Sequence, residues 1–230
     1  MPTNAAHHLG ATSKPGPMVV VDPTRLVTDD QLEALAPAAG MNGPFIADMT
    51  SDVLTHERGG FHLYRSVAGR TNNPLLKRQY EQHGKEAFAA ITAVEELIAS
   101  LGGDPGYVSP AARATEKAAM ANLEASFLLS GSVDLMTQEL VMLNAVLVAE
   151  AVAHANWSTL AELAGTCPEG GARTALQAAV DQVLPGADRH LTWARDTRQR
   201  LMVLQATSKA SATVGAKVEE VVDRIRGLFA

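Results

Sequence analysis

The alternation of apolar and polar residues along the chain predicts four long helices. In four segments, apolar residues recur every three or four positions, the spacing that gathers them on one helical face. The predicted helices span residues 45–67, 74–101, 133–164 and 172–206. Pro74 suits the first turn of a helix, and Gly102 and Gly103 follow the end of the second one. The pattern therefore predicts an all-α protein.

The connections between these helices indicate an up-and-down four-helix bundle with one long crossover. Residues 104–132 form a connection far longer than an antiparallel hairpin requires, and a short helix is expected within it over 111–129. A connection of this length lets the third helix begin near the same end of the bundle as the first. Pro185 and Gly186 are expected to interrupt the fourth helix, because proline removes a backbone donor.

The two ends of the chain differ from its centre. Residues 1–25 contain four prolines and little periodicity, so we expect a flexible arm there, followed by a short helix over 29–35. The bundle is expected to occupy residues 26–210. An amphipathic C-terminal helix is predicted within 211–230, where it could dock on the bundle or on another subunit. Its heptad-like apolar positions are Val214, Val218, Val221, Ile225 and Leu228.

Composition narrows the classes of function. The chain has 230 residues and 47% hydrophobic content, which suffices for a substantial core. Its net charge of -6 argues against a general electrostatic grip on nucleic acid or an anionic membrane. Cys167 is the only cysteine, and no apolar run approaches the roughly 20 residues that span a bilayer. We therefore expect a cytoplasmic protein whose partners are ions, small molecules or other proteins.

Three glutamates interrupt the apolar stripes of the predicted helices near their middles, namely Glu57, Glu86 and Glu150. A bare buried carboxylate is unfavourable, so each needs an ion-pair partner or a metal ion. The same stripes contain little lysine or arginine, but they do contain His83, His154 and His190. Carboxylates and imidazoles together in the middle of a helical bundle indicate a metal site.

The heights of these residues in the bundle can be compared by counting from the turns. With a turn near residue 71, Glu57 and Glu86 lie at the same height on the first two helices. With a turn near residue 168, Glu150 and His190 differ by four residues, or about 6 Å at the rise of an α-helix. Four helices are thus expected to offer one metal-type side chain each at a roughly common level.

Plainer interpretations of the same residues remain open at this point. Glu57 could pair with Arg58 or Arg65 at the surface of the bundle. His154 could hydrogen-bond Glu150 one helical turn away, or could be satisfied within the core. Agreement of helix, face and height across four segments favours the metal site over these independent explanations.

Two pairs of residues carry a resemblance to a known family. Glu57 and Tyr64 on the first predicted helix, and Glu150 and Trp157 on the third, place an aromatic residue seven positions after a glutamate. This spacing resembles the pattern of ferritins and bacterioferritins. The aromatic residues alone would be read as core fillers, so the glutamates give the pattern its meaning.

Two longer stretches extend the resemblance to the ferritin-like superfamily, which includes the rubrerythrin-related proteins. The stretch YEQHGKEAFAAITAVEELIASLGGDP is similar to the second helix of small bacterial ferritin-like stress proteins. The string ADRHLTWA, which contains His190, is similar to the last helix of that superfamily. The similarity covers about residues 45–206.

The resemblance implies a di-metal site that holds two iron or manganese ions and reacts with dioxygen or peroxide. It further implies an oxidase, ferroxidase or peroxidase type of activity, a role in stress protection, and a homo-oligomer. Tyr64 would hydrogen-bond near the metals or be oxidised. The implied ligands are Glu57, His83, Glu86, Glu150 and His190, with His154 and Asp188 in reserve.

Two positions depart from the family's pattern. The second-helix motif would place a histidine at Ala89, and the fourth-helix motif would place a glutamate at Ala187. His83 could replace the first missing ligand, and Asp188 could replace the second. A complete di-metal site, a single-metal site and an empty site therefore stay open. The alternative function is a metal-free bundle that acts as an assembly module through its C-terminal helix, and iron storage in a shell is a third.

Overall fold

The computed structural model describes residues 40–128 and 133–207, which form five helices and no strand. This confirms the prediction of an all-α protein, and the long helices begin and end within a few residues of the expected positions. The helices are α3 (Gly43–Arg70), α4 (Pro74–Ser100), α5 (Pro110–Ala125), α6 (Leu135–Thr166) and α7 (Gly171–Thr207). The expected arm over 1–25, the short helix over 29–35 and the helix within 211–230 lie outside the described residues.

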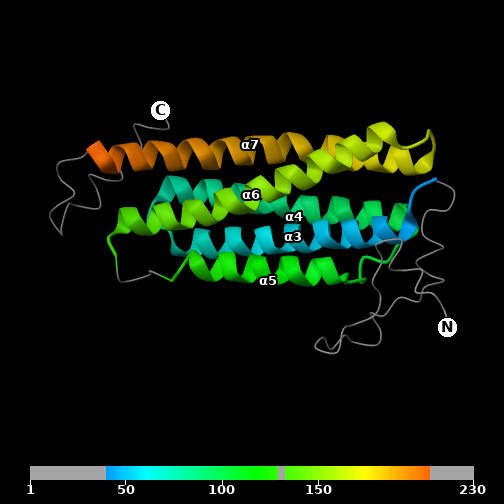
Figure 1. Cartoon of the computed structure of the whole chain (residues 1–230). Coiled ribbons are helices and arrows are strands. Elements are labelled where there is room, and N and C mark those ends of the chain that lie inside the picture. Colours follow the sequence, from blue (N-terminus) through cyan, green and yellow to red (C-terminus); the bar gives the residue numbers. More distant parts are fainter. Residues whose placement is uncertain (1–39, 129–132, 208–230) are drawn as a thin grey trace, which may run out of the picture.

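Four long helices pack side by side as a bundle, and α5 lies along its outside (Figure 1). Helix α3 packs against α4 and α6, and α7 packs against the same two helices, so the four form a closed ring. Helix α5 covers α3 and also contacts α6. The interior of the bundle is therefore lined by one face from each of α3, α4, α6 and α7.

The helices begin where a side chain caps the first turn. Four residues accept hydrogen bonds from backbone N–H groups of the first helical turn, which otherwise lack partners. These caps are Asn42 for α3, Asn73 for α4, Ser109 for α5 and Asp134 for α6. A proline follows each of the first three caps within two residues, where its missing N–H is not needed.

Helix α5 runs along part of the bundle, parallel to α3. At its start, the backbone N–H of Ser109 donates to Ser51 Oγ at 2.9 Å. Further along, Ala119 lies against Gly59, where a Cβ on the glycine would come within 2.7 Å of the alanine Cβ. The two helices therefore advance in the same direction and are in close contact.

The direction of this crossover corrects one prediction. Thr71, just after α3, donates to Glu139 Oε1 near the start of α6 at 2.6 Å, so α6 begins where α3 ends. The expectation that the third helix starts at the same end as the first is wrong. Because α4 has already returned the chain to the starting end of α3, the crossover moves it to the opposite end.

Helix α7 continues without a break through Pro185, so the predicted interruption is wrong. Proline removes one backbone hydrogen bond from a helix interior. Val180 and Ala187 on either side of Pro185 are buried in the core. Packing of the helix on both sides of the proline offsets the missing bond, as tertiary contacts commonly override local propensity.

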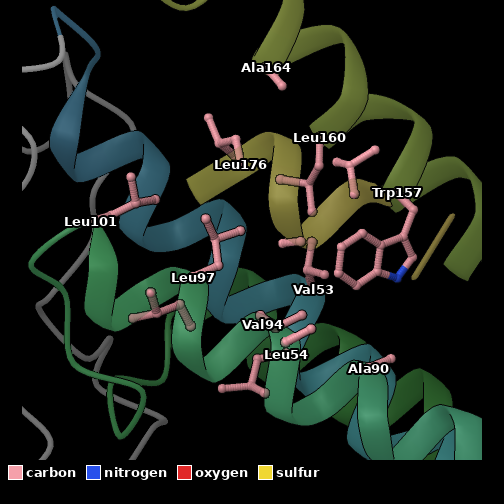
Figure 2. Close-up of a cluster of buried hydrophobic side chains, with 14 of the residues drawn as sticks. Val53, Leu54, Ala90, Val94, Leu97, Leu101, Trp157, Leu160, Ala164 and Leu176 are labelled. Carbon is pink, nitrogen blue, oxygen red and sulfur yellow. The ribbon is translucent and has the colours of Figure 1, made fainter. Parts of the chain in front are cut away.

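Two apolar clusters fill the bundle, one towards each end. The first gathers residues of α3, α4, α6 and α7 around Trp157 and Leu160, as Figure 2 shows. The second gathers Tyr64, Tyr80 and Leu143 with their neighbours at the other end. Along the helices, the buried polar residues considered below fall between these two clusters.

Helix α6 is the one helix among the described residues that is long and apolar enough to cross a membrane. This differs from the expectation that no apolar run reaches such a length. A helix that is apolar on most sides also occurs in the core of large bundles, and α6 packs against three other helices. Glu139 and Glu150 are buried on it.

Candidate functional site

A cavity of about 200 Å³ lies between the two apolar clusters. Glu57 from α3, Glu86 from α4, Glu150 from α6 and His190 from α7 all line it. Each of the four bundle helices therefore contributes at least one carboxyl group or histidine to a single space. Tyr64 also lines the cavity.

His190 links two of the carboxylates. Its Nε2 atom lies 2.9 Å from Glu86 Oε2, and its Nδ1 atom lies 3.6 Å from Glu150 Oε2. Glu150 and His190 are therefore at the same level, and the offset of four residues predicted from the turn is absent. Burial alone would lower the pKa of His190, but Glu150 and Glu86 outweigh burial and raise it. The geometry thus favours an imidazolium between two carboxylates.

Glu150 is held from a second side by Tyr64. The Tyr64 hydroxyl donates to Glu150 Oε1 at 2.6 Å, and the tyrosine is 2% exposed. Burial raises the pKa of Tyr64 well above its usual value, and the charge of Glu150 raises it further. Tyr64 is therefore a neutral donor that fixes one oxygen of Glu150.

Glu57 is a buried carboxyl group that forms no ion pair with a described residue, although His190 lies close enough for its charge to act on it. Glu57 is 6% exposed, and Trp157 Nε1 donates to its Oε1 atom at 2.8 Å. The alternative pairing at the surface is not found, because Arg58 pairs with Glu95 and Arg65 lies over the ring of Phe61. Burial raises the pKa of Glu57 to about 7, and the nearby charge of Glu150 adds to the effect.

Glu86 lies at the solvent side of the cavity. Burial would raise the pKa of this carboxyl, but three hydrogen bonds outweigh burial and lower it to about 2. The donors are Gln82 Nε2 at 2.8 Å, His190 Nε2 at 2.9 Å and Arg189 Nη2 at 3.1 Å. Sequence reasoning missed Arg189, because its position beside His190 gave no sign that it would reach across to α4.

The structure does not bring the remaining expected ligands to the cavity. His83 stacks on the His190 ring with 4.1 Å between ring centroids, and its Nδ1 atom is buried without a hydrogen-bond partner. Burial lowers the pKa of His83 to about 3, so the ring is neutral. His154 pairs instead with Asp188 at 2.8 Å, with side chains 35% and 59% exposed. None of these three residues lines the cavity.

No model of a protein family matches the chain, and neither a curated protein nor a solved structure matches it.

Two further polar residues line the cavity. His56 Nε2 lies 2.9 Å from the carbonyl oxygen of Ala149, and burial lowers the pKa of this histidine. Trp157 is fully buried and orients Glu57. His56 was not singled out from the sequence. Its place in the cavity depends on the rotation of α3, which sequence spacing gave no reason to expect.

Small residues leave the cavity open. Ala89 and Ala187, the two positions where the family's pattern would place ligands, both line it. The other small lining residues are Gly60, Ala87, Ala90, Ala149, Ala153 and Gly186. The volume that two ligand side chains would fill is therefore part of the cavity.

The donor atoms are of the types that metal ions bind, but they do not surround a single point. Among residues 40–128 and 133–207, no three His, Cys, Asp or Glu side chains are arranged to hold one ion as they stand. The carboxylates are bonded instead to Trp157, Tyr64 and His190. Binding would require rotation of these side chains towards the cavity that they share.

Proposed function

We propose that the cavity binds iron or manganese and that the protein is a ferritin-like carboxylate protein that handles dioxygen or peroxide. The observation that carries this proposal is Glu57, which is buried beside Glu150 and is compensated only in part by the Trp157 N–H and the charge of His190. A buried carboxyl group either keeps its proton or needs an opposite charge. A cation bound in the cavity would supply it.

The proposal of a ferritin-like fold is supported by the path of the chain. Helices α3 and α4 form one antiparallel pair and α6 and α7 form another, as Figure 1 shows. The long crossover between the pairs runs the length of the bundle, which is the topology of bundles that bind metals with inward-pointing carboxylates and histidines.

The identity of the donors favours iron or manganese. Glu57, Glu86, Glu150 and His190 offer oxygen and imidazole nitrogen ligands, which suit these metals, whereas a sulfur-rich site would need cysteines. Ala89 and Ala187 reduce the number of donors below the usual six, and His83 and Asp188 do not replace them. Four donors favour a single ion over the pair of ions that the resemblance implies.

The chain's own residues have definite tasks in this proposal. A bound metal would supply Lewis acidity and electrons to dioxygen or peroxide. Trp157 and Tyr64 each hold one oxygen of Glu57 and Glu150, so these donors orient the carboxylates. Metal uptake would displace the proton that burial keeps on Glu57 and the extra proton on His190, so binding releases protons to solvent.

Metal content tests the proposal. The protein is expressed without a tag in medium with iron and manganese, and the purified protein is analysed by inductively coupled plasma mass spectrometry. We expect about one equivalent of iron or manganese in the wild type and a loss of most of it in Glu57→Gln/Glu150→Gln. The glutamines keep the shape of both side chains and one accepting oxygen on each.

Glu139→Gln is the matched control, because Glu139 is another buried glutamate of α6 that does not line the cavity. It should retain the metal. Equal metal in the double variant and the wild type, or metal in neither, would overturn the proposal.

A second candidate function is assembly without metal, and one observation favours it. The outward face of α6 exposes Val148 and Val152, with relative exposures of 49% and 43%. Ala151 and Ala155 are exposed on the same helix. An uncharged apolar face of this kind is commonly covered by another helix or subunit.

Deletion of residues 212–230 tests this second candidate. If the predicted amphipathic C-terminal helix joins subunits, the full chain should be oligomeric and the truncated chain monomeric, as measured by light scattering after size-exclusion chromatography. The same mass per particle in both proteins would exclude assembly through that segment.

A further inference from the structure

Among the four helices that line the cavity, only two contribute exposed lining residues. Its exposed lining residues are Ala89 on α4 and Gln182 and Arg189 on α7. The lining residues from α3 and α6 are buried or partly buried, including Glu57 and Trp157. Helices α3 and α6 therefore form the floor of the cavity, and its mouth lies between α4 and α7.

Gly186 keeps this mouth open. A Cβ atom at position 186 would lie 3.6 Å from both Arg189 Nη2 and Glu86 Oε2. A side chain at this position would start in ordinary contact with the two residues and extend between them. Glycine is unfavourable in a helix interior by about 1 kcal/mol relative to alanine, so its presence here is not explained by helix stability.

Arg189 lies across the mouth. Its contact with Glu86 Oε2 is 3.1 Å long, and the arginine side chain is 65% exposed. Ion pairs in contact with solvent contribute little free energy, because water screens the charges and the long side chains lose freedom. The Nη1 atom of Arg189 also donates to the carbonyl oxygen of Pro185 at 3.0 Å, in contact with solvent. Because both contacts are exposed, Arg189 can swing away from Glu86 at small cost.

We propose that the seam at Ala89 and Gly186 is the entrance through which a small uncharged molecule reaches the cavity, with Arg189 as its movable cover. The opposite charges of Arg189 and Glu86 offset each other at the mouth, which suits the entry of an uncharged molecule. A volume of about 200 Å³ exceeds the roughly 150 Å³ that accommodates benzene in an engineered cavity. That the molecule is dioxygen or peroxide rests on the proposed function, whereas the entrance itself does not.

Trp157 provides a reporter inside the cavity that needs no metal. It lines the cavity and is fully buried, so a neutral quencher should reach it through the mouth. The probe is acrylamide, and the metal-free full chain carries Trp193→Phe to leave Trp157 as the only tryptophan. In this background we expect Gly186→Leu to lower the bimolecular quenching constant of Trp157 several-fold. Arg189→Ala should raise the same constant.

Gly165→Leu is the matched control. Gly165 is also a helical glycine, on α6, and a Cβ there would meet nothing within 4 Å. Leucine favours a helix over glycine, so both leucine variants should fold, which circular dichroism verifies. Equal quenching in Gly186→Leu and Gly165→Leu would overturn the proposed entrance. Because this experiment uses metal-free protein, it can succeed or fail independently of the metal content measured above.

Discussion

Truncation of Trp157 to alanine should lower the free energy of unfolding by about 3–5 kcal/mol, the usual range for removing a large aromatic side chain from a core. Trp157 is fully buried and packs in the first apolar cluster beside Leu160 and Val53, as Figure 2 shows. The truncation also removes the donor to Glu57. Urea denaturation of the metal-free protein at pH 7 measures the loss.

Trp157→Phe separates the two contributions. Phenylalanine keeps much of the apolar contact but cannot donate to Glu57, so this variant should lose about 1–3 kcal/mol, the penalty of an unsatisfied buried group. Leu160→Ala, one turn further along α6, is the control for packing alone. If Trp157→Phe is as stable as the wild type, the hydrogen bond to Glu57 contributes nothing and our account of that carboxyl fails.

Glu57→Gln should stabilise the metal-free protein at alkaline pH. The pKa of Glu57 is raised from 4.5 to about 7 in the folded protein. A carboxyl with a raised pKa contributes stability that is fully present below pH 4.5 and is lost as the pH rises through 7. Glutamine mimics the protonated form at every pH. The variant should therefore match the wild type near pH 4.5 and exceed it by up to roughly 3 kcal/mol at pH 8.

Chemical denaturation in the presence of a chelator, repeated from pH 4.5 to pH 8, gives this difference directly. Glu162→Gln on the exposed face of α6 is the control and should leave the pH dependence of stability unchanged. With iron or manganese in excess, the wild type should instead be more stable than Glu57→Gln, because the variant lacks a metal ligand. If the wild type is more stable than Glu57→Gln at pH 8 without metal, ionisation of Glu57 does not lower the free energy of unfolding, which contradicts the account.

Periodicity and turn residues were sufficient to predict the helices. The four long helices were predicted because apolar spacing marks their faces, and Pro74, Gly102 and Gly103 bound the second of them. The direction of the crossover was not predicted correctly, because a long connection can end at either end of the bundle. Continuity of α7 through Pro185 was missed as well, since local propensity does not include the packing of Val180 and Ala187.

The sequence predicted which helix carries each residue of the candidate site and its approximate height in the bundle. It did not predict which side chains these residues contact. Buried carboxylates stand out in an apolar stripe, and so Glu57 and Glu150 were identified. Contacts between helices depend on how each helix is rotated. That rotation turns His83 to stack on His190 and joins His154 to Asp188.

The most direct test of the central claim is a crystal structure of the protein grown with manganese, with anomalous diffraction data collected above and below the manganese absorption edge. We expect one strong peak in the cavity, with oxygen atoms of Glu57 and Glu150 and a nitrogen of His190 at roughly 2.0–2.3 Å from it. A cavity without an anomalous peak, or a peak bound only by the surface pair His154 and Asp188, would contradict the account.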